Sequence, residues 1–220
     1  MTKYEEKIFA GIGSRKVPEV FQPFMSAITF YLVYYCGFNL RSGRAPRSDD
    51  YFERGLPKGL EHRSEIYLPR EGFGGKGKGV GILTTNMMSK LDAIHIISTN
   101  QLHEDWDNLM NSKGDSFAVA AHIRNVFQIL GDLTDGEKPV KFVVCWTPDG
   151  AKTHLKTTDA TGGTRTAINL ASRRGIPVFN LANRDDLYRM YKRVSSVKIP
   201  FQLPPLPELE RYCSRRQTQV

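Results

Sequence analysis

The sequence predicts an α/β fold with a mostly parallel central sheet and helices on both of its faces. Short apolar runs typical of strands alternate with helical stretches along most of the chain. The first run, residues 8–12, leads into a Gly-x-Gly turn and then a helix, as at the start of many nucleotide-binding α/β domains. Two further loops, 40–43 and 161–164, are expected beside this turn at the carboxyl ends of parallel strands, where such sheets bind ligands.

The length and composition indicate a globular domain with a normal core. The chain has 220 residues, of which 40% are apolar and 25% are charged. We expect one nucleotide-binding domain over residues 1–195 and a Pro-rich, then basic, tail over residues 196–220. The net charge of +8 favours polyanionic partners such as nucleotides or nucleic acid. The alternative is that this charge only keeps the protein soluble.

Three widely spaced cysteines and the apolar runs indicate the compartment. Cys36 and Cys145 lie in apolar patterns, typical of core thiols in a reducing environment. No Cys/His cluster has zinc spacing, so we predict no metal site, and we expect no cofactor. The first residues lack signal-peptide architecture, and no apolar run reaches the ~20 residues of a membrane helix. The expected location is the cytoplasm, without membrane contact.

The first half of the chain is expected to form three strands and two helices. A strand over 8–12 is followed by a helix over 18–36, then by a strand over 38–41. Ser48 is the predicted N-cap of the second helix, and residues 65–69 form the third strand.

Two stretches in the middle of the chain leave alternatives open. The Gly-rich loop 70–81 carries two lysines and either folds over an anion or is an ordinary surface loop. Residues 86–99 fit a helix or a strand. A helix beginning at Ser116 and a buried strand over 140–146 are clear.

The last elements complete the alternation. A turn over 147–150 and a polar loop lead to a helix over 163–174. A strand over 177–181 and a helix over 185–194 follow. The extended apolar stretch 199–207 is expected to lie against the domain or a partner.

Candidate ligand residues lie in the three loops. Glycines at 11 and 13 let a ligand approach the backbone, or simply permit a tight turn. Arg15 can pair bidentately with a phosphate, and the amides at 162–164 begin a helix, which favours anions. The predicted phosphate-binding residues are Gly11, Gly13, Ser14, Arg15, Arg41, Ser42, Gly43, Arg44, Arg47, Gly162, Gly163, Thr164, Arg165 and Thr166.

The motifs, in this order, resemble the DprA-like Rossmann proteins often carried by phages. The motifs are Gly-Ile-Gly-Ser-Arg at 11–15, Leu-Arg-Ser-Gly-x-Ala at 40–45, Ile-Tyr-Leu-Pro at 66–69, His-x-x-Trp at 103–106, His-x-Arg-Asn at 122–125, the strand and turn 143–150, the Gly-Gly loop 162–168 and the strand 175–181. The resemblance covers about residues 8–185 and implies a Rossmann-like three-layer sandwich with a ligand groove at the three loops. The wider group includes DNA-binding DprA, the "lonely guy" phosphoribohydrolases and sensors of ADP-ribose-type signals, so fold membership does not settle function.

Three arginines depart from the pattern of these relatives. Arg44, Arg47 and Arg165 stand where the relatives usually carry glycine. Arginine suits phosphates but occupies space. Either the ligand carries more negative charge than a mononucleotide, or these side chains fill the ancestral phosphate site.

The glycosidase members use a carboxylate just after the glycine loop, and this chain has none there. The matching positions are Ile168 and Asn169. Asp49 and Glu53, one helical turn apart, are the alternative catalytic candidates, or they are only helix and surface charges.

A trio on one helix is expected to support the groove. His122, Arg124 and Asn125 match a motif that in relatives looks like part of the groove or its support. His122 and Asn125 are three residues apart and share a helix face.

These observations favour a protein that binds a nucleotide or nucleotide-derived ligand without strong catalysis. One biological form is the sequestration of a nucleotide signal of a phage host. The second hypothesis is a DprA-type recombination mediator that holds single-stranded DNA on its basic surface. The third is a nucleotide N-glycosidase or ribosyl transferase. Relatives often dimerise, so a homodimer is also expected.

Overall fold

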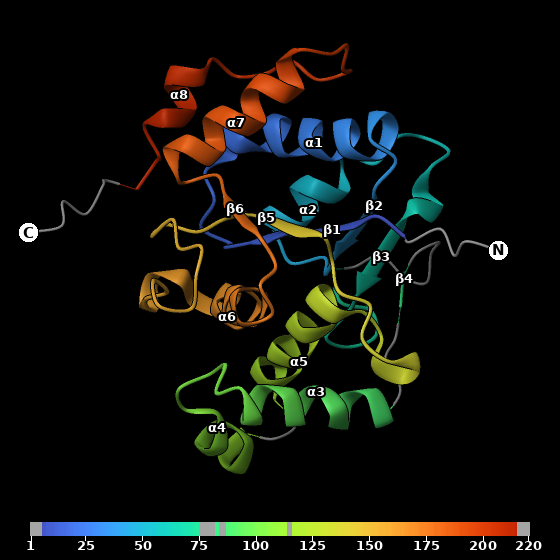
Figure 1. Cartoon of the computed structure of the whole chain (residues 1–220), viewed down its shortest axis with the longest axis vertical. Coiled ribbons are helices and arrows are strands. Elements are labelled where there is room, and N and C mark those ends of the chain that lie inside the picture. Colours follow the sequence, from blue (N-terminus) through green and yellow to red (C-terminus); the bar gives the residue numbers. More distant parts are fainter. Residues whose placement is uncertain (1–5, 75–81, 84–86, 114–115, 215–220) are drawn as a thin grey trace, which may run out of the picture.

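The computed structural model describes residues 6–74, 82–83, 87–113 and 116–214. Within these residues, six strands form one sheet in the order β4-β3-β2-β1-β5-β6, and every neighbouring pair is parallel. Helices cover both faces of the sheet (Figure 1). The predicted α/β, Rossmann-like three-layer sandwich is therefore confirmed.

The strand order creates a switch point beside the first strand. The strands are β1 (Ile8–Gly13), β2 (Asn39–Ser42), β3 (Ser64–Tyr67), β4 (Ile82–Leu83), β5 (Phe142–Trp146) and β6 (Val178–Asn180). The chain builds the sheet outward from β1 to β4 and then returns to place β5 on the other side of β1. The register pairs Gly13 with Trp146, so β1 and β5 end at the same edge. Ligand crevices in open α/β sheets lie at such a point.

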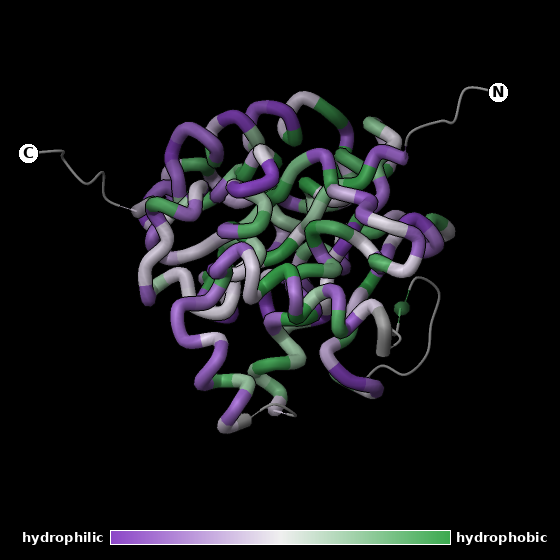
Figure 2. The backbone as a smooth tube through the Cα atoms, turned by 60° about the horizontal axis from the view of Figure 1, so that its bottom comes forward, coloured by the Kyte–Doolittle hydropathy of each residue, from purple (hydrophilic) through white to green (hydrophobic). Residues whose placement is uncertain are grey.

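Each helical layer has its own apolar core. The helices are α1 (Gln22–Phe30), α2 (Ser48–Glu53), α3 (Met87–Thr99), α4 (Trp106–Lys113), α5 (Phe117–Leu130), α6 (Arg165–Arg173), α7 (Arg184–Ser195) and α8 (Leu206–Glu210). Helices α1, α2, α7 and α8 lie above the sheet in Figure 1, and α3 to α6 lie below it. Successive β1 residues alternate between the layers: Ile8 packs below and Phe9 above. Figure 2 shows apolar residues concentrated along the central strands.

The first predicted helix is present but its geometry changes along its length. A 3₁₀ turn over Glu19–Phe21 precedes α1, and a π-helical turn over Tyr31–Tyr35 follows it. Gly37 ends the helix with φ of 70°, as a left-handed C-terminal glycine does.

The structure shows which element residues 87–99 form, and it corrects the predicted N-cap of α2. Residues 87–99 form α3, whose Ala93 and Ile97 are fully buried in the lower core. The predicted N-cap Ser48 is wrong: Arg47 takes that position with φ of 72°. The Ser48 hydroxyl instead donates to the Ser14 carbonyl at 2.7 Å, which ties α2 to the turn after β1.

The segment after α7 folds back onto the domain. Phe201 and Leu206 pack against the upper core, and Leu209 of α8 is fully buried there. The predicted contact of the apolar stretch with the domain is confirmed, while residues 215–220 lie outside the described part. In the Gly-rich loop, positions 75–81 are likewise outside it. None of the described helices is long and apolar enough to cross a membrane.

Candidate functional site

A groove of about 360 Å³ lies at the carboxyl ends of β1 and β2. Its lining comes from the turn after β1, the start of α2, the loop after β3, one face of α5 and the loop before α6. The lining residues are Ile12, Gly13, Ser14, Arg15, Lys16, Ala45, Pro46, Asp49, Phe73, Phe117, Ala118, Ala121, His122, Arg124, Asn125, Gln128, Gly162, Gly163 and Thr164. This brings together the first and third predicted loops and the predicted trio on α5.

A buried ion pair forms the floor of the groove. Arg124 Nη1 donates to Asp49 Oδ2 at 2.9 Å and to the Gly43 carbonyl at 2.8 Å. Gln128 Nε2 also donates to Asp49 Oδ2, at 3.2 Å. Burial raises the pKa of Asp49, and the positive charge of Arg124 opposes this shift.

Arg124 retains an unused donor. Its side chain is only 9% exposed, and its Nε has no hydrogen-bond partner among the described residues. A buried donor of this kind is rarely left unsatisfied without a reason. The groove floor therefore carries a cation with spare hydrogen-bonding capacity.

The glycines of the first loop serve packing within the protein. A Cβ atom on Gly11 would lie 2.7 Å from Phe52 Cγ, and one on Gly13 would lie 2.8 Å from the Trp146 carbonyl oxygen. Gly43 leaves the space that the Arg124 guanidinium occupies. The missing side chains of Gly11 and Gly13 thus admit neighbouring parts of the fold. Gly13 also belongs to the groove lining, and a ligand-contact role for these two glycines stays a prediction.

The glycine loop before α6 behaves differently. A Cβ atom on Gly162 or Gly163 would meet no described atom within 4 Å. Gly162 has φ of 61° and ψ of −148°, a conformation that favours glycine. Asn125 Nδ2 donates to the Gly163 carbonyl at 2.7 Å and fixes the loop to α5. This loop therefore offers open backbone to the groove.

Asp149 organises the segment that leads into this loop. Its carboxylate accepts hydrogen bonds from the hydroxyls of Thr147, Thr158 and Thr161 and from the amides of Ala151 and Thr158. Burial alone would raise the pKa of Asp149, but these hydrogen bonds outweigh it and hold the pKa below its usual value. The loop is thus built on one ionised carboxylate.

Arg44 and Arg47 point away from the groove. Both keep left-handed backbones, with φ of 55° and 72°. The Arg44 backbone amide and Nε donate to Glu53, at 2.8 and 3.3 Å. Arg47 Nη1 donates to the Val17 carbonyl at 3.0 Å. Neither arginine belongs to the described groove lining, and their contact with a ligand stays a prediction.

Four other predicted residues are engaged elsewhere. Arg41 is fully buried and donates to Glu65 at 2.7 Å. Arg165 pairs with Glu104 and Asp159 at 3.1 and 2.9 Å. The Ser42 hydroxyl donates a hydrogen bond to the Gly11 carbonyl at 2.8 Å. The Thr166 hydroxyl forms a hydrogen bond with His122 Nδ1, also at 2.8 Å. None of the four belongs to the described groove lining, so the structure does not bring them together with the other predicted phosphate-binding residues.

Of the two candidate catalytic carboxylates, only Asp49 reaches the groove. Glu53 lies under Arg44, where burial and the charge of Asp49 raise its pKa to about 7. After the glycine loop, Ile168 is fully buried. Asn169 accepts a hydrogen bond from the Thr157 hydroxyl and donates one to the Leu102 carbonyl. Those positions serve packing.

His122 is a neutral group in the groove wall. Its ring lies 4.6 Å from the ring of His103 and 6.1 Å from that of Trp106. Burial, with the charges of His103 and Arg124, lowers the pKa of His122 to about 4. The imidazole is therefore uncharged near neutral pH.

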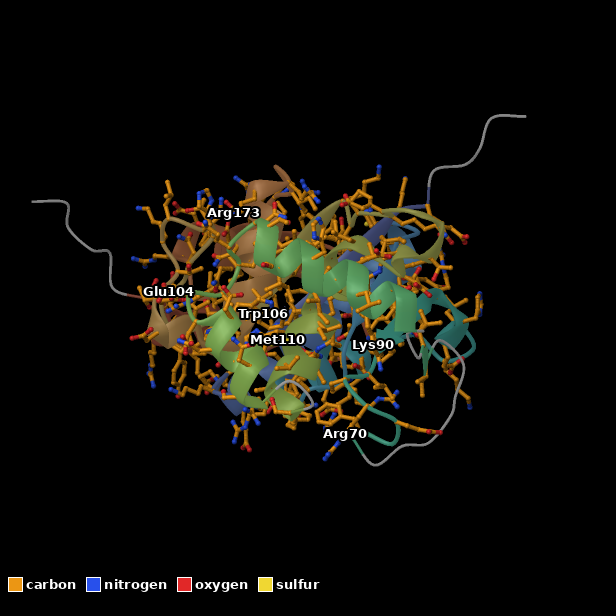
Figure 3. All side chains as sticks on the ribbon, turned by 90° about the horizontal axis from the view of Figure 1, so that it is seen from below. Arg70, Lys90, Glu104, Trp106, Met110 and Arg173 are labelled. Carbon is orange, nitrogen blue, oxygen red and sulfur yellow. The ribbon has the colours of Figure 1, made fainter. Side chains whose placement is uncertain are left out.

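Sequence reasoning missed an aromatic end of the groove. Phe73, in the loop after β3, lies 5.3 Å from Phe117, the first residue of α5. The Arg70 guanidinium lies 5.4 Å from the Phe117 ring centre, and Figure 3 shows Arg70 at this rim of the molecule. The sequence offered one signal for this end of the groove: Phe117 directly follows the N-cap Ser116 and is not among the buried residues of its helix.

No family model, no curated protein and no solved structure matches this chain. The described residues also contain no cluster of three or more His, Cys, Asp or Glu side chains that could hold a metal ion. Fold and groove together define an α/β protein with a Rossmann-like sheet and a small groove at the carboxyl edge of that sheet. The resemblance to DprA-like proteins stays a prediction.

Proposed function

We propose that this groove binds one nucleotide or nucleotide-derived phosphate ligand. The observation that carries the proposal is the open backbone of Gly162 and Gly163 in the same groove as Arg15 and Lys16. Arg15 and Lys16 are exposed and form no ion pair with any described residue. Backbone amides at a helix start and unpaired cations suit a phosphate group.

The size of the groove supports a single small ligand. Its volume of about 360 Å³ is near the lower end of the roughly 300–1,000 Å³ typical of small-molecule sites. This favours one nucleotide over a longer polymer within the groove itself.

The carboxylate chemistry supports binding over bond cleavage. Asp49 is the sole carboxylate in the described lining, and Arg124 and Gln128 occupy one of its oxygens. A glycosidase-type reaction needs a carboxylate placed at the reacting sugar. Retention or sequestration of a nucleotide signal is the biological role that we infer.

The test is the thermal stabilisation of the protein by a panel of ligands at two salt concentrations. The panel contains mononucleotides, cyclic dinucleotides, ADP-ribose derivatives and short single-stranded oligonucleotides. We expect a saturable, salt-tolerant shift with one small nucleotide, because a ligand that binds the folded state raises its stability. Arg15→Ala should reduce the shift. Arg173→Ala removes the same charge at a residue outside the groove lining and should not reduce it.

Two other outcomes would replace the proposal. A shift confined to oligonucleotides that vanishes at high salt would favour single-stranded DNA binding. Release of free base from a bound nucleotide, abolished by Asp49→Asn, would favour the N-glycosidase.

A further inference from the structure

We propose that Phe73 and Phe117 form a stacking subsite for the base of the bound nucleotide. The inference rests on the proposed function and adds an orientation: base at the aromatic end, phosphate at the Gly162–Gly163 end. It assigns a ligand contact to two residues that no sequence motif marked.

The two rings form a wall of the groove. They lie 5.3 Å apart with their planes tilted by 37°. Both line the groove, yet Phe117 remains 39% exposed, so a large part of its apolar surface is uncovered. The Arg70 guanidinium also lies over the Phe117 ring, 5.4 Å from its centre. A flat aromatic ligand can cover the surface that stays exposed.

The face of α5 in the groove changes character along its length. Ala118 and Ala121 follow Phe117 and leave room for a planar ring. His122 and Asn125 come next on the same face, and Asn125 holds the Gly163 carbonyl. At 1.5 Å per residue, the path from Phe117 to Asn125 is about 12 Å. Along this face of α5 the groove is therefore first aromatic, then polar, and finally bordered by the open backbone of the glycine loop. Base, ribose and phosphate follow one another in the same order in a nucleotide.

The middle of this path suits ribose. His122 lines this part of the groove as an uncharged imidazole, and Arg124 and Asn125 line it on the same helix. Ribose hydroxyls both donate and accept hydrogen bonds, as such neighbours require.

The chemistry at the aromatic end favours stacking. Besides the two rings, the described groove lining contains the small apolar side chains of Ala118, Ala121 and Pro46. Every base has a flat face that can stack, and a larger ring system overlaps an aromatic side chain over a larger area. A purine should therefore bind more tightly than a pyrimidine, and a ligand without a base should bind least.

The experiment compares the affinities of AMP, CMP and ribose 5-phosphate by titration calorimetry. In the wild type, AMP should bind at least about tenfold more tightly than ribose 5-phosphate, or about 1.4 kcal/mol, with CMP between them. Phe117→Ala should bring AMP close to ribose 5-phosphate and leave ribose 5-phosphate unchanged. Phe117→Tyr should keep the preference. Leu91→Ala truncates another exposed apolar side chain outside the groove and should change neither ligand.

Three results would overturn the inference, and they can be told apart. Equal wild-type affinities for AMP and ribose 5-phosphate would remove the base subsite but leave a phosphate-binding groove. Equal weakening of both ligands by Phe117→Ala would show that Phe117 acts on the start of α5. Binding of none of the three ligands would overturn the proposed function as well. Unchanged melting temperatures without ligand would establish that the variants fold.

Discussion

Arg124 on α5 and Asp49 on α2 form a buried ion pair of 2.9 Å that links the two helical layers around the carboxyl edge of the sheet. The side chains of these residues are 9% and 2% exposed. Arg124 also reaches the Gly43 carbonyl after β2. One guanidinium therefore holds three separate segments in place beneath the groove.

Loss of Arg124 should strongly destabilise the fold. Arg124→Gln leaves the Asp49 carboxylate buried without its cation, and breaking a buried pair in this way costs about 3–5 kcal/mol. The free energy of unfolding from urea titration measures the change. Arg54→Gln breaks the exposed pair with Asp50 and should cost less than about 1 kcal/mol. Equal effects of the two substitutions would contradict this account.

Glu53 should make the stability depend on pH. Its pKa in the folded protein is about 7, against an ordinary value of 4.5. Because the folded-state pKa is raised, protonation favours the folded state. This stabilisation is fully present below about pH 4.5 and is lost as the pH rises through about 7. Relative to Glu53→Gln, the wild type should lose roughly 3 kcal/mol of unfolding free energy over this range.

The control for Glu53 is an exposed acid. Glu19, with a side chain 83% exposed, should leave the pH profile unchanged when replaced by Gln. A wild-type profile that runs parallel to that of Glu53→Gln between pH 4.5 and 7 would be evidence against the raised pKa.

Two glycine substitutions should separate packing from ligand binding. Gly163→Ala meets open space, so the unfolding free energy should change by no more than about 0.5 kcal/mol. Its methyl group nevertheless projects where a phosphate would approach, so the thermal shift with nucleotide should shrink. Gly11→Ala would press on Phe52 and Leu40 and should lose about 1–3 kcal/mol. The reverse pattern would contradict the assignment of the two loops.

Arg47→Gly should leave nucleotide binding intact. A left-handed backbone at a residue other than glycine costs on the order of 1 kcal/mol, and the bond to the Val17 carbonyl returns a similar amount. The net stability should therefore change by less than about 1 kcal/mol. Measured binding of AMP to the variant is the check: a loss of affinity would mean that Arg47 reaches the ligand.

The fold was largely predictable because its pattern is local. Each strand is a short apolar run, and each helix has caps or an apolar face, so the alternation alone indicated a parallel sheet. Residues 86–99 could not be decided by periodicity. Burial of Ala93 and Ile97 against the lower core is a tertiary effect that the local pattern does not contain.

The groove was predictable only where its residues directly adjoin a predicted strand or helix. The turn after β1 and the loop before α6 met this condition. Phe73 did not, because its place depends on how the loop after β3 crosses α5. Arg41 lies in a strand and yet does not line the groove. It is paired directly with Glu65 on β3, and this cross-strand partner directs it away from the loops.

The pairing of β1 with β5 has a consequence for the order of folding. These neighbours in the sheet are separated by more than half of the chain, and such non-local contacts form late because closing a long loop costs entropy. The glycine loop before α6 lies further still toward the C-terminus. A ribosome-bound chain that has not yet emerged past α6 would therefore lack a complete groove. If the groove binds nucleotide as proposed, binding would report that synthesis has passed this point.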